Sequence, residues 1–127
     1  PEVLSKEPLA PLAAGGDQRL ADAMRWVIYA LIAAEELGIT QENIGNKLAE
    51  AQSRPQLTQL RRFLGVEADL GQKLGLNNDF IVKVIQAVGN YGEIYDRHLG
   101  PKSAVPIPRG LNNLYSNGGI LTSPPFQ

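Results

Sequence analysis

The chain has 127 residues, of which 43% are hydrophobic and 20% are charged, a composition typical of a soluble globular domain. Its net charge of −1 comes from 12 basic and 13 acidic residues with no long block of one sign, so neither nucleic acid nor an anionic membrane is indicated as a partner. The sequence contains no Cys, which excludes disulfides, thiolate metal sites and a Cys nucleophile.

The start of the chain predicts one extended segment followed by one amphipathic helix. Val3–Ala14 carries two prolines, which favour the edge of a sheet over its middle. After the turn at Gly15-Gly16, Asp17 is a favourable N-cap, and Gly38 is a favourable residue to end the helix. One face of this helix is expected to be buried, through apolar residues at three- and four-residue spacing: Leu20, Met24, Val27, Ile28, Leu31 and Ile32.

The middle of the chain predicts a series of further helices. Thr40 is expected to cap a second helix, and Ser53, with a proline just behind it, is expected to open a third that ends at Gly65. A short helical turn is expected over Glu67–Leu74, and Asn77 is expected to cap the last helix. The positions expected to face inward in the second and third helices are Ile44, Leu48, Leu57, Leu60 and Leu64.

The last helix is predicted to be long. Its apolar side continues over several turns, through Phe80, Ile81, Val84, Ile85, Val88, Tyr91 and Tyr95. Gly89 and Gly92 would each weaken an isolated helix by about 1 kcal/mol relative to Ala. We therefore expect these glycines to permit close approach by the tail or by a neighbouring helix.

The tail after Gly100 is expected to be irregular but ordered. It contains glycines and prolines that fix special backbone angles: Gly110, Gly118, Gly119, Pro101, Pro106, Pro108, Pro124 and Pro125. One turn of helix is predicted around Leu111–Tyr115. The fold class predicted for the chain is mostly α, with four or five helices and little or no sheet.

His98 is the only His in the chain, and Glu93, Asp96 and Arg97 lie close to it in the sequence. This grouping allows the hypothesis of a general base held by a carboxylate. No Ser lies in a setting typical of a nucleophile, and a His near a helix end is stabilised by the helix dipole. We therefore predict no catalytic residue, no cofactor and no metal site, and we predict that the chain is not an enzyme.

Two charged pairs have both a structural and a functional interpretation. Glu93 and Arg97 have the spacing of an ion pair on a helix surface, which contributes about 0.2–0.5 kcal/mol. Arg61 and Arg62 could form an anion site or a docking contact. Because adjacent residues on a helix point in different directions, a solvated face is the favoured interpretation of the two arginines.

Several aromatic residues are candidates for a binding surface. Tyr91, Tyr95 and Tyr115 could form an aromatic wall for a ligand, but such residues more often belong to the core and keep their hydroxyls at the surface. Trp26 lies in the most apolar helix and is expected to bury a large area. The segment Gly89–Gly92 lacks the sequence of a phosphate-binding loop.

Four stretches of the chain carry a resemblance to one family: Pro1–Pro11, Leu20–Thr40, Arg61–Phe80 and Gly89–Gln127. In this order they resemble the C-terminal portion of the general L-amino-acid-binding proteins of bacterial ABC importers. These proteins belong to the polar amino-acid branch of the extracellular solute-binding proteins and are type II periplasmic binding proteins.

The resemblance implies a division of the chain within one compact unit of an α/β lobe. Residues 1–38 would form a strand returning from the second lobe to the first and the first-lobe helix that follows. Residues 39–100 would form a helical extension, and residues 101–127 the ordered irregular tail.

The resemblance also implies a longer parent protein, periplasmic or extracellular, whose two lobes close over an L-amino acid and then contact a membrane permease. The groups that bind the ligand are implied to lie mainly before this stretch, so the ligand-binding residues of this chain are unknown and its role is expected to be structural. Its nearest partner would be the N-terminal lobe of the parent. The alternative is an autonomous helical interaction module or a homodimer, because an isolated lobe fragment leaves Trp26 and its neighbours uncovered.

Overall fold

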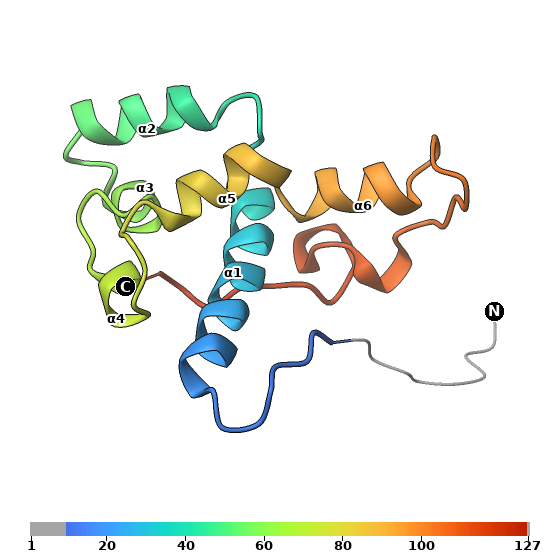
Figure 1. Ribbon diagram of the computed structural model, residues 1–127. Helices are drawn as coiled ribbons and strands as arrows, with labels where there is room; N and C mark the ends of the chain where they lie inside the picture. The colour runs from blue at the N-terminus through green and yellow to red at the C-terminus, as the bar shows by residue number, and fades with distance from the viewer. Residues whose placement is uncertain (1–9, 127) are drawn as a thin grey trace.

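The computed structural model of the chain describes residues 10–126. Within this range the chain forms six α-helices and two short 3₁₀ helices (Figure 1), and the one strand pairing is an isolated parallel bridge between Leu114 and Leu121. The prediction of a mostly α fold is therefore confirmed. The expected returning strand at Pro1–Pro11 lies almost entirely outside the described residues. No helix in the described range is both long enough and apolar enough to cross a membrane.

Helix α1 (Gln18–Glu36) runs through the centre of the molecule (Figure 1). It begins as predicted, because the side chain of Asp17 accepts a hydrogen bond of 2.9 Å from the backbone N–H of Leu20. The chain turns away from it at Gly38, whose φ of 63° is left-handed. The face predicted to be buried is covered only in part: Ile32 is buried, whereas Leu20 is 46% exposed. The reason is that α5 and α6 pack against α1 near its C-terminal end.

The second and third helices begin later than predicted. Helix α2 (Ile44–Ser53) starts at Ile44, with Asn43 at its N-cap position. One turn earlier, the Thr40 hydroxyl accepts from the Asn43 N–H at 3.2 Å and the Asn43 side chain accepts from the Thr40 N–H at 2.8 Å, so Thr40 caps the turn that leads into the helix. The hydroxyl of Ser53 donates to a carbonyl within the last turn of α2, so Ser53 ends one helix and does not open the next. Helix α3 (Thr58–Phe63) follows a break at Pro55, because the residue before a proline is driven to extended angles.

Helix α4 (Leu70–Lys73) is the short turn expected from the sequence, and helices α5 (Phe80–Val88) and α6 (Tyr91–Leu99) replace the single long helix that was predicted. The break lies at Gly89, which has a φ of 77°. Asn90 then caps α6 through a capping box with Glu93. The Asn90 side chain accepts from the Glu93 N–H at 2.9 Å, and the Glu93 carboxylate accepts from the Asn90 N–H at 2.8 Å.

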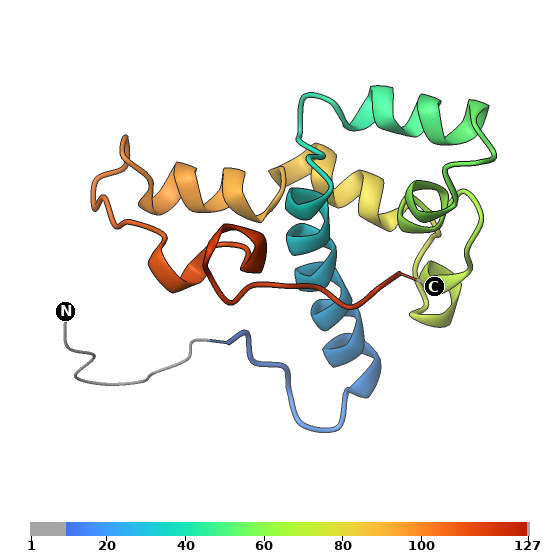
Figure 2. The same ribbon diagram turned by 180° about the vertical axis from the view of Figure 1, so that it is seen from behind.

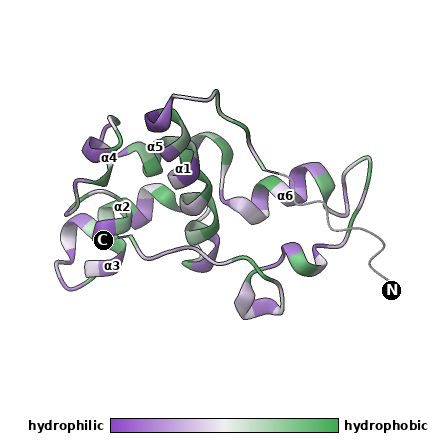
Figure 3. Ribbon diagram, turned by 90° about the horizontal axis from the view of Figure 1, so that it is seen from below, coloured by the Kyte–Doolittle hydropathy of each residue, from purple (hydrophilic) through white to green (hydrophobic). Residues whose placement is uncertain are grey.

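The hydrophobic core lies where α1, α2, α3 and α5 meet, and Figure 3 shows hydrophobic segments of these helices gathered there. Phe63 is a central residue of this core, 1% exposed, although it was not among the positions predicted to face inward. The largest fully buried side chains are Phe63, Ile39, Ile44, Leu64, Ile81 and Ile85.

The tail after α6 turns back over the molecule. It contains two 3₁₀ turns, η1 (Gly110–Asn112) and η2 (Tyr115–Asn117), in place of the single helical turn predicted around Leu111–Tyr115. It then crosses α1, and the last described residues lie beside α3 and α4 (Figure 2). The tail thereby runs from the side of α1 that carries α6 to the side that carries α3 and α4 (Figure 2).

Candidate functional site

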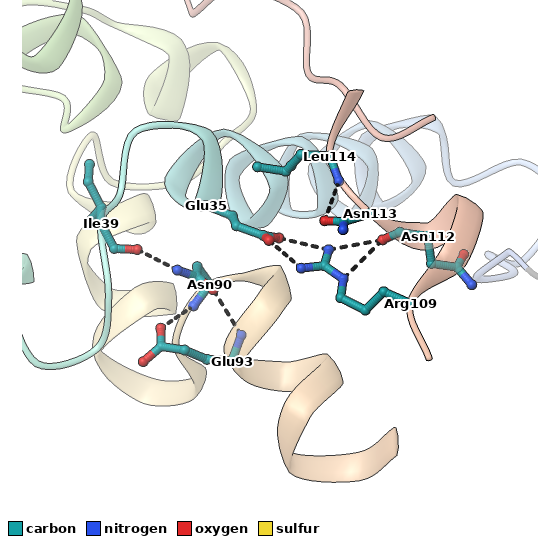
Figure 4. Close-up of polar contacts among 8 residues, drawn as sticks. All are labelled: Glu35, Ile39, Asn90, Glu93, Arg109, Asn112, Asn113 and Leu114. Carbon is teal, nitrogen blue, oxygen red and sulfur yellow. Dashed lines mark hydrogen bonds and ion pairs between the residues drawn. The ribbon is translucent and has the colours of Figure 1, made fainter. Parts of the chain in front are cut away.

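The most elaborate polar cluster lies where the end of α1, the start of α6 and the tail meet (Figure 4). Its centre is a bidentate ion pair between Arg109 and Glu35, which lie 74 residues apart in the sequence. Nη1 of Arg109 donates to one carboxylate oxygen, and Nη2 donates to the other at 3.1 Å. The two side chains are only 17% and 14% exposed. An ion pair this deep ties the tail to α1 with defined geometry.

The remaining donors of Arg109 hold the tail's own backbone. Nε and Nη2 donate to the carbonyl oxygen of Asn112 at 3.2 and 2.9 Å. The hydrogen bonds to the Glu35 carboxylate raise the pKa of Arg109 above its ordinary value, although burial acts in the opposite direction. Because all three nitrogens of the guanidinium have partners within the chain, the cluster acts as a structural tie.

Two tyrosines stack against this guanidinium. The Cζ atom of Arg109 lies 5.7 Å from the ring centre of Tyr91 and 5.5 Å from that of Tyr95, within the range of cation–π contacts. The hydroxyl of Tyr95 donates to the carbonyls of Ile107 and Pro108 at 3.2 and 3.3 Å. The expectation that this hydroxyl lies at the surface is therefore wrong. Tyr115 is 77% exposed and stands apart from this group.

Gly92 provides the space for the cluster. The sequence predicted that this glycine permits close approach by the tail or by a neighbouring helix, and side chains of both the tail and α1 lie against it. A Cβ atom at position 92 would lie 2.9 Å from the carboxylate of Glu35 and 3.2 Å from Nη1 of Arg109. A side chain at this position would therefore displace the ion pair from α6.

A second set of bonds joins the start of α6 to the segment between α1 and α2. Asn90 is buried, and its side-chain amide donates to the carbonyl of Ile39 at 2.8 Å. The carboxylate of Glu93 accepts from the backbone N–H of Gln41 at 3.1 Å, and the Gln41 amide donates to the carbonyl of Gln86 at 2.8 Å. These contacts fix α6 relative to the end of α1.

The predicted surface pair between Glu93 and Arg97 is therefore wrong. Glu93 is occupied by the capping box and by Gln41, and Nη2 of Arg97 donates to the carbonyl of Val88 at 2.8 Å. The reason is that the helix break at Gly89 leaves the Val88 carbonyl and the Asn90 N–H without helical partners. The side chain of Arg97 bonds the first group, and the side chain of Glu93 bonds the second.

The prediction of a solvated arginine pair holds for only one of the two residues. Arg62 is exposed, but the side chain of Arg61 is 18% exposed. Arg61 pairs with Glu67 at 2.8 Å and donates to the carbonyl of Ala51 at 2.7 Å. Arg61 thus connects α3 to the end of α2.

His98 lies on the exposed surface in the last turn of α6. In the part of the chain that the structure describes, no hydrogen bond joins it to Asp96 or Glu93. Across residues 10–126, no group of three or more His, Asp or Glu side chains is placed to hold a metal ion. The structure therefore brings Tyr91, Tyr95 and Glu93 into the polar cluster and leaves His98 and Tyr115 outside it.

Along its whole length, the chain is similar to periplasmic amino-acid-binding proteins of ABC transporters. It is 48% identical to the general L-amino acid-binding periplasmic protein AapJ of Rhizobium johnstonii and 45% identical to the glutamate/glutamine/aspartate/asparagine-binding protein BztA of Rhodobacter capsulatus. It is 42% identical to the putative amino-acid ABC transporter-binding protein YhdW of Escherichia coli. The chain spans 36% of the length of each of these relatives.

A solved structure agrees with these matches. An ABC transporter periplasmic binding protein from Brucella ovis with glutathione bound is 43% identical, with a TM-score of 0.88 over the whole of this chain and 39% of that one. No family model matches the chain. The resemblance inferred from the sequence is confirmed, and the chain corresponds to a partial segment of such binding proteins. These relatives are binding proteins rather than enzymes.

Proposed function

We propose that the chain is the C-terminal part of the substrate-binding component of an amino-acid importer of the ABC type, and that it works in the periplasm. The observation that carries this proposal is the match over the whole chain, at 42–48% identity, to relatives named as amino-acid-binding proteins of such transporters. The same relatives support a role in binding and transport rather than in catalysis.

Within the parent protein, the chain has a structural role and lacks a complete ligand site. The Arg109 guanidinium, which is the kind of group that binds a ligand carboxylate, is already paired with Glu35. The amino acid is bound mainly by residues outside this stretch, in a cleft that closes between two lobes. The ligand stabilises the closed form because it contacts both lobes only there.

The partner of the chain is the N-terminal lobe of the parent, which packs over the first half of α1. This half and the segment before it carry apolar side chains with little cover: Leu20 in the helix is 46% exposed, and Leu12 in the preceding segment is 92% exposed. A groove beside it is lined mainly by apolar side chains that include Met24 and Ile28. Exposed apolar side chains that gather in one place can mark an interaction site.

The same surface also favours a second candidate, in which the chain is an independent interaction module that pairs with a second copy. The two proposals differ in the length of the natural product, because the isolated chain leaves this face uncovered under either one. A module forms dimers as the concentration of the isolated chain rises, and mutation of Leu20 to Ser abolishes them. The parent proposal predicts instead that a longer product carries the chain and covers this surface.

The experiment that tests the proposal is identification of the natural product that contains this sequence. Intact mass spectrometry of the periplasmic fraction should find a product nearly three times as long as this chain, since the chain spans 36% of its relatives. Calorimetry with L-Glu, L-Gln, L-Asp, L-Asn and glutathione should show that this product binds an amino acid. A stable product of 127 residues in the cytosol would contradict the proposal.

A further inference from the structure

The last described residues of the chain lie in an aromatic groove between α1 and α3. The ring of Phe126 lies edge-on between two other aromatic rings, 5.2 Å from the ring centre of Trp26 and 5.0 Å from that of Phe63. A hollow of about 350 Å³ remains beside Phe126, lined in part by Ala33 and Leu37. The groove therefore holds the Phe126 ring without being filled by it.

Residues 122–126, which we call the strap, are attached differently from the tail that precedes them. Backbone hydrogen bonds anchor the preceding part. The N–H of Ile107 donates to Leu99, that of Tyr115 to Leu121 and that of Ile120 to Leu111, at 2.8, 2.8 and 3.0 Å. Within the described residues, no backbone–backbone hydrogen bond involves the strap.

Among residues 10–126, the polar attachment of the strap to the rest of the chain is a single carboxylate. Both the N–H and the hydroxyl of Ser123 donate to Glu36, at 3.3 and 3.1 Å, and both bonds are exposed to solvent. Exposed hydrogen bonds of this kind exchange readily with water. Pro124 and Pro125 restrict the backbone angles between Ser123 and Phe126, so the strap is expected to move as a stiff arm rather than to collapse.

From this difference we propose that residues 122–126 are a releasable strap. The strap closes the groove lined by Trp26 and Phe63, and it opens without unfolding the helices beneath it. Opening breaks the two exposed bonds to Glu36 and withdraws the Phe126 ring from Trp26 and from the core residue Phe63, whereas the backbone hydrogen bonds of residues 107–121 stay intact. Segments with few buried contacts and exposed hydrogen bonds open locally at lower free energy than the core.

The test uses Trp26, which is the only Trp in the chain, as its reporter. Phe126→Ala removes the ring that covers it, and Tyr115→Ala is the matched control, because Tyr115 is an exposed aromatic residue of the same tail. Two quantities are measured in the wild type and both variants. They are quenching of the Trp fluorescence by acrylamide and hydrogen exchange of the core amides, such as that of Ile39, which donates to Ala34 at 2.7 Å.

The strap proposal predicts a higher quenching constant and a red-shifted Trp emission in Phe126→Ala only, with core exchange as slow as in the wild type. Glu36→Ala should shift both fluorescence readouts in the same direction, because it removes the acceptor of Ser123. Quenching that does not change in Phe126→Ala would overturn the proposal, because Phe126 would then not cover the groove. Core exchange that accelerates together with quenching would also overturn it, because the strap would then be part of the cooperative fold.

Discussion

Replacement of Arg109 by Met tests whether the ion pair at the centre of the polar cluster holds the tail. The substitution keeps much of the apolar volume beside Tyr91 and Tyr95 but removes the charge. It leaves the Glu35 carboxylate, 14% exposed, without its main partner. Removal of one member of a fully buried pair costs roughly 3–5 kcal/mol. Because this site keeps some contact with water, we expect a loss of about 2–4 kcal/mol in the free energy of unfolding.

A double-mutant cycle separates the ion pair from general packing. Glu35→Leu combined with Arg109→Met replaces both charges by apolar side chains, a change that is often close to neutral for a buried pair. The double variant should therefore be destabilised by less than the sum of the single variants, with a coupling free energy of about 1–3 kcal/mol.

Urea unfolding followed by circular dichroism measures these differences. A chain of this size has a stability of roughly 6–19 kcal/mol, at about 0.05–0.15 kcal/mol per residue, so losses of the expected size are resolved. A loss below about 1 kcal/mol in Arg109→Met, which is the range of surface pairs, would show that the ion pair does not hold the tail. Strict additivity in the double variant would show the same.

Three further changes test other parts of the structure, each by thermal or urea unfolding. Trp26→Ala should cost about 2 kcal/mol of stability, less than the 3–5 kcal/mol of a fully buried Trp, because Trp26 is half-buried. His98→Ala should change the stability by no more than about 0.5 kcal/mol, because His98 is exposed. If His98→Ala were the more damaging change, His98 would become a functional candidate. Asn90→Ala removes a helix cap and leaves a buried carbonyl without its donor, so a loss of about 2–3 kcal/mol is expected, and a loss below about 0.5 would show that water replaces the amide. Gly119→Ala should unpack the tail and lower the melting temperature, because a Cβ atom there would lie 1.9 Å from a backbone oxygen. Gly15→Ala is the control and should be neutral, because a Cβ atom there meets no atom within 4 Å. Equal melting temperatures of the two variants would contradict the tail packing.

Local sequence signals predicted the parts of the fold that depend on local bonds. Asp17 predicted the start of α1, and Gly38 and Gly65 predicted where two helices end, because side-chain caps and left-handed glycines act within one turn. The break between α5 and α6 was missed because the apolar pattern continues through it. The signal that could have found it is Gly89 followed by the capping box of Asn90 and Glu93.

The polar cluster could not be predicted in the same way. Glu35 and Arg109 lie 74 residues apart, and no local pattern joins them. Their contact depends on the path of the irregular tail, which is set by tertiary packing rather than by any periodicity. Gly92 was the one local indication of the site, since a glycine inside a helix indicates close approach by another element.

Calorimetric titration of the purified 127-residue chain with L-amino acids tests the central claim most directly. If the chain is a structural part of a two-lobe binding protein, one lobe fragment offers only part of the contacts and cannot close over the ligand. We therefore expect no heat of binding from L-Glu, L-Gln, L-Asp or L-Asn at micromolar concentrations. Saturable binding with a micromolar or lower dissociation constant would contradict it, because a complete ligand site would then lie within this chain.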